Sequence, residues 1–363
     1  MMRQLPKLGV WCRFGHPRQG YAAGQSAFAL GRGHVVSSSR SFCAVSAARV
    51  KELRDRTGAS MGKCREALKE ETGDLDKAVE WLKKRGVRSM EKRAAESAEA
   101  LLSLGLDKNG VIIELRAETD FVTRNHIFQQ TLRHLATMVA GAPETASGGI
   151  EAILGMKVAD GPDRPVQLRE GAVLSEALLE LGSVLGEKLL LANVDFLAAP
   201  QQGVVAGYVH PKSADSLPGT GRLASLVSLR PSERCDPSAL QATASRLARH
   251  IVAAQPRFLS IGTVPEETLR KERDVFKAAY LEQIGPRKAG GVDEKVLQKV
   301  LDGKTAKFFQ DAVLACQELV APQVSGGDTA DQKPVPVSEW LEAEARSAGA
   351  GQILIEDFKL AVL

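Results

Sequence analysis

The residues best suited to chemistry stand in one short stretch, Glu118-Thr119-Asp120-Phe121-Val122. If the preceding strand continued, Glu118 and Asp120 would lie two residues apart on one face, where paired carboxylates can transfer protons. Nothing near them in the sequence suggests such a role. Phe121 adds an aromatic ring where a strand gives way to a helix, a place where rings are usually buried. The stretch therefore predicts either a packed corner or a surface that binds a partner, but not an active centre.

A hairpin and a helix are predicted to position this stretch. Val111–Leu115 is too apolar for a half-exposed strand and is typical of a buried one, and Leu101–Leu104 is a second apolar run. Between them, Asn109-Gly110 is the strongest short signal for a hairpin turn. After the stretch, the chain enters a helical pattern whose apolar face carries Phe128, Leu132, Leu135 and Val139. The sheet is thus expected to end by presenting a carboxylate and then an aromatic ring.

The remaining motifs predict no catalytic chemistry. Gly303-Lys304-Thr305 resembles the end of a phosphate-binding loop, but Gln298 stands where that loop needs its first glycine. The five cysteines form no C-x-x-C pair, and the histidines lack the spacing of metal ligands. Widely spaced thiols suit a reducing compartment. We therefore expect a protein that is not an enzyme and that holds no metal or other cofactor.

The charge of the chain is unevenly distributed. Its 363 residues carry 48 basic and 44 acidic side chains, yet the first 49 residues hold seven bases and no acid. This stretch is serine-rich and lacks the apolar segment of a secretory signal. Residues 1–45 are therefore predicted to be a mitochondrial transit peptide, with a disordered basic tail as the alternative. The other 41 bases and 44 acids give a net charge of −3, which argues against a general nucleic-acid binder. No later run of ~18 apolar residues predicts a membrane span.

Residues 46–86 are predicted to form a compact helical module. Its first helix begins near Ala47, and Ser60 and Asp74 are expected to cap the second and third helices. Gly86 is expected to end the third helix after a basic last turn. A module of ~40 residues has only a small core of its own.

Two motifs in this order resemble the translation elongation factor Ts family. The first covers Val50–Leu68 and Thr72–Leu82, and the second is Thr119-Asp120-Phe121-Val122. The resemblance extends over about residues 46–363 and is strongest up to about residue 130. It implies an α+β fold in which a small ubiquitin-associated-like helical bundle precedes a core of two α+β subdomains.

The expected domains follow from this resemblance. They are the transit peptide at 1–45, the ubiquitin-associated-like module at 46–86, a linker at 87–98, core subdomain N at 99–168 and core subdomain C at 169–363. Within subdomain C, the patterns predict helices at 175–185, 239–254, 265–281, 292–301 and 304–320, and strands at 188–196, 204–210, 223–229 and 351–363. Bacterial members of the family carry a long coiled-coil insertion, for which the segment 280–301 is too short.

The resemblance also implies a function and a set of contact residues. It implies a guanine-nucleotide exchange factor for mitochondrial elongation factor Tu, acting in the mitochondrial matrix as a heterodimer with that partner. Thr119, Asp120, Phe121 and Val122 would contact the partner near its Mg²⁺ ion, with Phe121 as a wedge and Asp120 helping to displace the support of the ion. Weaker contacts would come from Met61 and Gly62 in the helical module and from His210 and Arg222 in subdomain C.

Two functions of other classes stay open from the residues alone. A helical module of this type suits a ubiquitin- or peptide-binding adaptor, because a fold does not determine a function. An RNA-binding, ribosome-associated protein is a further possibility. It is disfavoured by the net charge of −3 after residue 49 and by an aromatic content of 5%. No direct binding to nucleic acid or to a membrane is expected.

Overall fold

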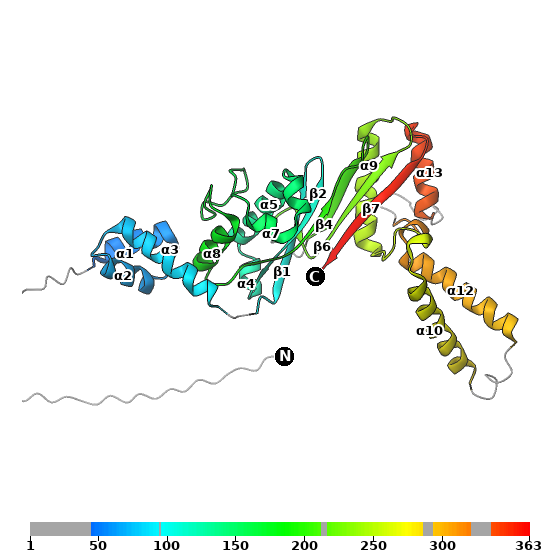
Figure 1. Ribbon diagram of the computed structural model, residues 1–363, viewed down its shortest axis with the longest axis horizontal. Coiled ribbons are helices and arrows are strands. Elements are labelled where there is room, and N and C mark those ends of the chain that lie inside the picture. Colours follow the sequence, from blue (N-terminus) through cyan, green and yellow to red (C-terminus); the bar gives the residue numbers. More distant parts are fainter. Residues whose placement is uncertain (1–44, 94–95, 212–215, 286–292, 321–334) are drawn as a thin grey trace, which may run out of the picture. The chain divides into compact units, whose positions relative to one another are not determined.

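The computed structural model describes residues 45–93, 96–211, 216–285, 293–320 and 335–363 (Figure 1). Helices and two antiparallel sheets make up this part of the chain, which confirms the predicted α+β class. The predicted transit peptide lies outside the described residues, apart from its last residue. No helix in the described ranges is long and apolar enough to cross a membrane.

Three helices form at the predicted N-terminal module: α1 (Ala47–Thr57), α2 (Met61–Glu70) and α3 (Leu75–Glu91). Ser60 accepts a hydrogen bond from the Lys63 N–H, and Asp74 accepts from the N–H groups of Asp76 and Lys77, so both predicted caps are confirmed. One apolar side of each helix meets in a small core. This core contains Val50, Leu53, Cys64, Ala67, Leu68, Ala78 and Leu82.

The third helix does not end at Gly86, as the sequence predicted, but continues through half of the predicted linker to Glu91. Gly86 is buried inside α3, where it faces α8 (Leu174–Leu185). A Cβ atom at this position would lie 1.9 Å from the Ser183 Oγ atom and 2.7 Å from the Ser183 Cβ atom. Gly86 is therefore required by the close approach of two helices rather than by a helix end.

The first sheet has the strand order β3-β2-β1-β5. Its strands are β1 (Glu99–Leu106), β2 (Gly110–Ala117), β3 (Leu190–Leu197) and β5 (Thr220–Gly221). The predicted hairpin is confirmed, because β1 and β2 pair in register from Glu99 with Ala117 to Leu106 with Gly110. Its connection is the three residues 107–109 rather than a two-residue Asn-Gly turn. Gly110 is already the first residue of β2, where a Cβ atom would clash with Leu226 at 2.5 Å.

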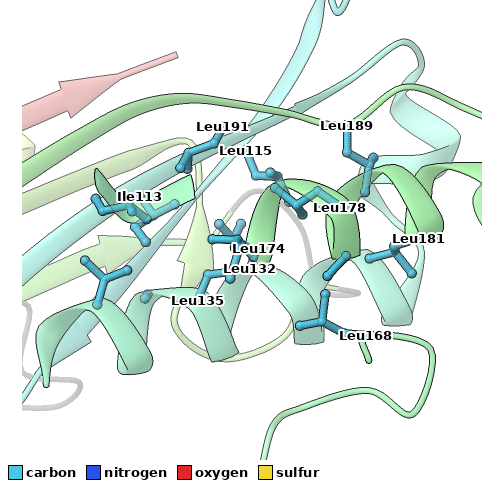
Figure 2. Close-up of a cluster of buried hydrophobic side chains, with 14 of the residues drawn as sticks. Ile113, Leu115, Leu132, Leu135, Leu168, Leu174, Leu178, Leu181, Leu189 and Leu191 are labelled. Carbon is cyan, nitrogen blue, oxygen red and sulfur yellow. The ribbon is translucent and has the colours of Figure 1, made fainter. Parts of the chain in front are cut away.

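One face of the first sheet is covered by helices. These are α5 (His126–Ala140), the short helices α6 (Pro143–Ser147) and α7 (Gly149–Leu154), and α8. The predicted apolar face of α5 is confirmed, and it packs with α8 against alternate residues of β2. Figure 2 shows this cluster, which includes Ile113, Leu115, Leu132, Leu135, Leu174, Leu178 and Leu191. The sequence predicted α8 and β3 within the second subdomain, but both belong to the sheet and core of the first.

The second sheet has the order β4-β6-β7. Its strands are β4 (Val204–His210), β6 (Leu223–Pro231) and β7 (Ile353–Val362), each close to a predicted strand. Helices α9 (Pro237–Ala254) and α13 (Val337–Ala348) cover one face, through a core that includes Val227, Leu229, Leu247 and Trp340.

The two sheets pack against each other through their other faces. Leu102 and Ile112 point from the first sheet, and Val205 and Leu226 from the second, into one shared buried cluster. Because side chains alternate along a strand, each sheet buries both faces. The result is four layers in the order helix, sheet, sheet, helix, in which both sides of each hairpin strand are fixed by packing.

Two further helices, α10 (Glu266–Ile284) and α12 (Glu294–Ala312), contact each other, and Arg273 pairs with Asp302 at 3.0 Å between them. The short helices η1 (Ile261–Thr263) and η2 (Leu314–Cys316) flank this pair. The sequence predicted a break near Gly303, but α12 passes through this residue without interruption. Thr305, two residues further on, donates to the Leu301 carbonyl as it would inside any helix.

Candidate functional site

The stretch Thr119–Val122 forms an exposed corner between β2 and α5. Strand β2 ends at Ala117, Thr119 precedes a single helical turn, α4 (Asp120–Thr123), and α5 begins at His126. Val122 points into the first core and is 8% exposed, whereas Phe121 is 80% exposed. The alternative that Phe121 is a core residue is therefore wrong. We refer to Thr119–Val122 as the corner.

The two carboxylates of this region do not form a pair. The prediction that Glu118 and Asp120 share a strand face is wrong, because the strand ends before both. Glu118 turns toward Arg93, whose Nε and Nη2 atoms lie 2.6 Å from its two oxygens. Asp120 pairs instead with Arg124 on the surface at 2.9 Å. Each carboxylate is thus held by its own arginine, which gives no basis for shared proton transfer.

A residue that no sequence motif singled out holds the backbone of the corner. Glu187, in the loop between α8 and β3, accepts hydrogen bonds from the N–H groups of Glu118 and Thr119 at 3.1 and 3.0 Å. Its second oxygen accepts from the Thr119 hydroxyl at 2.5 Å. The sequence indicates only that the chain turns here, because a predicted helix ends at residue 185 and Gly186 follows it.

A second residue that the sequence pattern did not single out, Gln129, holds the backbone directly after the corner. Gln129 is 3% exposed, and its amide donates to the Thr123 carbonyl at 3.2 Å. Its carbonyl accepts from the Leu217 N–H at 2.7 Å. The same buried side chain therefore joins the corner to the segment that leads into β5.

The predicted contact residues of the second half lie side by side. His210 ends β4 and pairs with Leu223, the neighbour of Arg222. Gly221 makes this possible, because a Cβ atom there would lie 1.9 Å from the His210 carbonyl oxygen. His210 and Arg222 are both exposed, and the Tyr208 hydroxyl lies 3.4 Å from the His210 Nδ1 atom. These side chains form a small polar surface at the end of β4.

The predicted contact residues of the helical module stand at the start of α2. Met61 is 39% exposed, and no described atom lies within 4 Å of a Cβ atom placed on Gly62. Both residues belong to the first turn, directly after the Ser60 cap. This turn is an open surface with one flexible apolar side chain, which suits contact with another protein.

Two buried histidines serve the fold. His250 on α9 accepts from the Val320 N–H through Nδ1 at 3.2 Å, so its Nε2–H donates to Gln317 Oε1 at 3.1 Å. His134 Nε2 donates to the Ala159 carbonyl at 3.0 Å. Burial lowers the pKa of both imidazoles, which favours their neutral form. Across the described ranges, no three His, Cys, Asp or Glu side chains gather as a metal site.

Apart from the buried Val122, the predicted contact residues lie exposed or half-exposed at the surface. The corner presents an exposed aromatic ring on a backbone fixed by buried and half-buried polar groups, which is how interface anchors are presented. Its carboxylates are neutralised by arginines rather than poised beside a nucleophile.

The comparison with known proteins places the chain in a family. The family model described as elongation factor TS matches residues 118–325, so the match begins one residue before the corner. The chain is 31% identical to elongation factor Ts of Ehrlichia ruminantium (strain Gardel) over 316 residues, which cover 86% of this chain and 97% of that protein. It is 34% identical to elongation factor Ts of Rhodospirillum rubrum over 278 residues, which cover 76% and 82% of the two chains. The chain therefore belongs to the elongation factor Ts family.

Proposed function

We propose that this protein is a guanine-nucleotide exchange factor for elongation factor Tu, and that its partner is the mitochondrial form. The observation that carries the proposal is the Phe121 ring, 80% exposed at the end of a buried sheet. An exposed ring on a fixed backbone can enter a partner at little ordering cost. The protein itself would carry out no covalent chemistry and hold no cofactor.

The physical basis of such exchange is linkage. The factor weakens the hold of the partner on its nucleotide by the same factor by which the nucleotide weakens the complex. A weakening of about 10⁴-fold requires about 5.5 kcal/mol of differential binding. One buried aromatic anchor contributes roughly 2–4 kcal/mol, so Phe121 would supply a large part, and further contacts must supply the rest.

Three surfaces would together supply this binding free energy. The corner would enter the nucleotide domain of the partner near its Mg²⁺ ion, with Phe121 as the wedge. Met61 and Gly62 of the three-helix module, which we infer to be of the ubiquitin-associated type, would contact the same domain. His210 and Arg222 would reach another domain. Their adjacency supports a common contact, since His210 at the end of β4 pairs with Leu223, the residue directly after Arg222.

The proposal of a mitochondrial protein rests on the first 49 residues, which hold seven bases and no acid. A segment of this composition suits import into the matrix. We therefore propose that the protein works in the mitochondrial matrix, on the elongation factor Tu of that compartment.

The decisive experiment measures release of a fluorescent GDP analogue from purified mitochondrial elongation factor Tu. Residues 46–363 should accelerate release many-fold over the spontaneous rate, and excess unlabelled GDP should suppress complex formation, as linkage requires. If release stays at the spontaneous rate while the chain captures ubiquitin or ribosomal RNA, one of the alternative functions is correct and the proposal fails.

A further inference from the structure

The corner is held by a reciprocal pair of carboxylates from two segments of the chain. Glu187 accepts from the backbone N–H groups of Glu118 and Thr119, and Glu118 in turn accepts from the backbone N–H of Lys188 at 2.8 Å. Each segment thus supplies a carboxylate to the backbone of the other. We call this arrangement the carboxylate brace. It joins residues about 70 positions apart in the sequence.

We propose that Glu187 is a positioning residue for nucleotide exchange: it fixes the backbone of the corner so that Phe121 is presented in its binding conformation before the partner arrives. This inference rests on the proposed function. It adds a residue outside the corner that touches no nucleotide and acts only through Thr119 and its neighbours.

Phe121 is held mainly through the backbone on either side of it. Phe121 is 80% exposed, so packing among the described residues does not hold its ring, and the direction of the ring depends on the backbone around it. Val122 anchors one side of that backbone in the core. On the other side, the strand pairing with β1 ends at Ala117, and the two N–H groups that follow both donate to Glu187.

The position of Glu187 is itself built by two glycines. Gly186 ends α8 in the left-handed region at φ 83°, which non-glycine residues adopt at a cost. The N–H groups of Gly186 and Glu187 both donate to the Gly182 carbonyl, at 2.8 and 3.1 Å. A Cβ atom on Gly182 would lie 2.7 Å from the Glu187 carbonyl oxygen. The chain therefore turns tightly enough to direct Glu187 back toward the corner.

Two basic residues, Arg93 and Lys188, contact the carboxylate brace and its surroundings. Arg93, just beyond α3, grips both oxygens of Glu118 and donates to the Gly186 carbonyl at 2.8 Å. The Lys188 ammonium group lies 3.4 Å from the Arg93 carbonyl oxygen. Two positive side chains thus accompany the two carboxylates, so the brace is close to neutral. Hydrogen bonds to charged groups in such a network are stronger than those between neutral groups.

The consequence for binding is preorganisation. A corner that had to be ordered on binding would lose affinity to the entropy of ordering, whereas a braced corner has lost that entropy already during folding. Removal of Glu187 is therefore expected to loosen the corner in the free protein and to weaken the exchange complex, without loss of any direct contact to the partner.

The test compares Glu187→Ala, Glu187→Gln and a matched control, Glu180→Ala. Glu180 is a half-buried glutamate of the neighbouring helix α8 that pairs with Arg169 at 2.8 Å, away from the corner. In the free proteins, hydrogen exchange of the peptide that contains residues 118–124 reports the order of the corner. Release of GDP from mitochondrial elongation factor Tu then reports its function, and urea unfolding reports global stability.

Glu187→Ala is expected to speed exchange of the Glu118 and Thr119 amides about 10-fold and to slow GDP release about 10-fold at subsaturating factor, as loss of a charged hydrogen-bond acceptor implies. Glu187→Gln should keep both amide exchange and GDP release close to the wild-type values. Its amide oxygen can accept from the two N–H groups, and its NH₂ group can donate to the Thr119 hydroxyl oxygen. Glu180→Ala should leave both measurements at the wild-type level.

Thr119→Val provides a second route to the same answer if Glu187→Ala folds poorly. In the free protein it removes only the hydroxyl contact to Glu187, so the double variant with Glu187→Gln should speed amide exchange of the corner by less than the two single variants combined. Unchanged amide exchange in Glu187→Ala, or a loosened corner with a wild-type rate of GDP release, overturns the proposal. If the wild-type chain itself fails to accelerate release, the proposed function fails, and amide exchange alone then decides whether Glu187 fixes the corner.

Discussion

Phe121 and Val122 are adjacent in the chain, but they have opposite surroundings. The single turn of α4 directs Val122 into the core between β2 and α5 and leaves the neighbouring ring in solvent. An exposed phenylalanine gives up the roughly 1.5–3 kcal/mol that burial of its side chain would contribute. Contact with a partner can recover that free energy, so the location of the ring favours a role in binding.

Replacement of this ring separates binding from folding. Phe121→Ala is expected to leave the free energy of unfolding nearly unchanged and to slow catalysed GDP release by one to three orders of magnitude, as loss of roughly 2–4 kcal/mol of contact implies. Stopped-flow release of labelled GDP measures this effect. Val275→Ala, which trims another exposed apolar side chain on α10, is the matched control and should act like the wild type. A Phe121→Ala protein that unfolds early, yet exchanges normally per folded molecule, would contradict the assignment.

His250 should make the stability of the protein sensitive to mild acid. Its pKa is lowered in the folded state, mainly by burial, so the unfolded chain takes up a proton first as the pH falls below about 6.5. The free energy of unfolding should therefore be highest above that pH and decline below it, by up to about 1.4 kcal/mol per pH unit for each such histidine. Urea unfolding between pH 5.5 and 8 measures the slope.

His250→Asn should flatten this slope, because the amide oxygen can still accept from the Val320 N–H but does not titrate. His134 contributes in the same direction, since burial also lowers its pKa. His126→Asn, at the exposed start of α5, controls for the type of substitution. An equally steep slope in His250→Asn would assign the acid sensitivity to other groups.

At the scale of the elements, local patterns identified most helices and strands, whereas contacts between elements decided where several of them end. Alternation and apolar runs were sufficient for the hairpin, β4, β6 and the apolar face of α5. They failed at Gly86 and Gly303, where a glycine within a helical pattern was interpreted as a break. Gly86 is instead the site of contact with Ser183, almost 100 residues away, which no local pattern encodes.

In the candidate site, too, local features could be predicted from the sequence, whereas contacts from distant segments could not. The strand-to-helix location of Phe121 follows from the residues on either side of it, whereas the sequence left open whether the ring is buried or exposed. Glu187 and Gln129 could not be predicted, because their role is to contact the backbone of the corner and its surroundings from distant segments. A glutamate after a helix and a glutamine within one are ordinary in any sequence, and only the folded chain gives them partners.

The two misinterpreted glycines form a matched pair for measuring helix contact. Gly86→Ala should lower the free energy of unfolding by about 1–3 kcal/mol, because the new methyl group overlaps Ser183. Gly303→Ala, inside α12 with no described atom within 4 Å of its new Cβ, should raise it by up to about 1 kcal/mol. Urea unfolding of both variants gives the comparison, and Ser183→Gly should rescue Gly86→Ala. Equal effects at the two sites would mean that α3 and α8 are not packed this closely.

At the scale of the whole molecule, targeting and exchange should be separable. Deletion of residues 1–45 is expected to leave the protein in the cytosol, because the basic, acid-free segment is gone. The truncated protein should keep full exchange activity in vitro, since every surface proposed to contact the partner lies after residue 45. Fluorescence microscopy of tagged chains and the GDP-release assay test the two halves. Matrix localisation of the truncated protein would contradict the transit-peptide assignment.

The two sheets also differ in how soon they can form while the chain is being made. The three long strands of the first sheet all lie between residues 99 and 197. In the second sheet, β6 can complete its pairing only after β7 has been made, because paired residues such as Ser228 and Asp357 lie 129 positions apart. A chain that emerges from a ribosome or an import channel with its N-terminus first can therefore assemble the strand that leads into the corner early. Until residue 362 arrives, β6 keeps an unpaired edge, and such edges promote aggregation. Chains interrupted before β7 would thus combine a formed corner with an aggregation-prone second sheet. We therefore expect such chains to require chaperones and not only to be inactive.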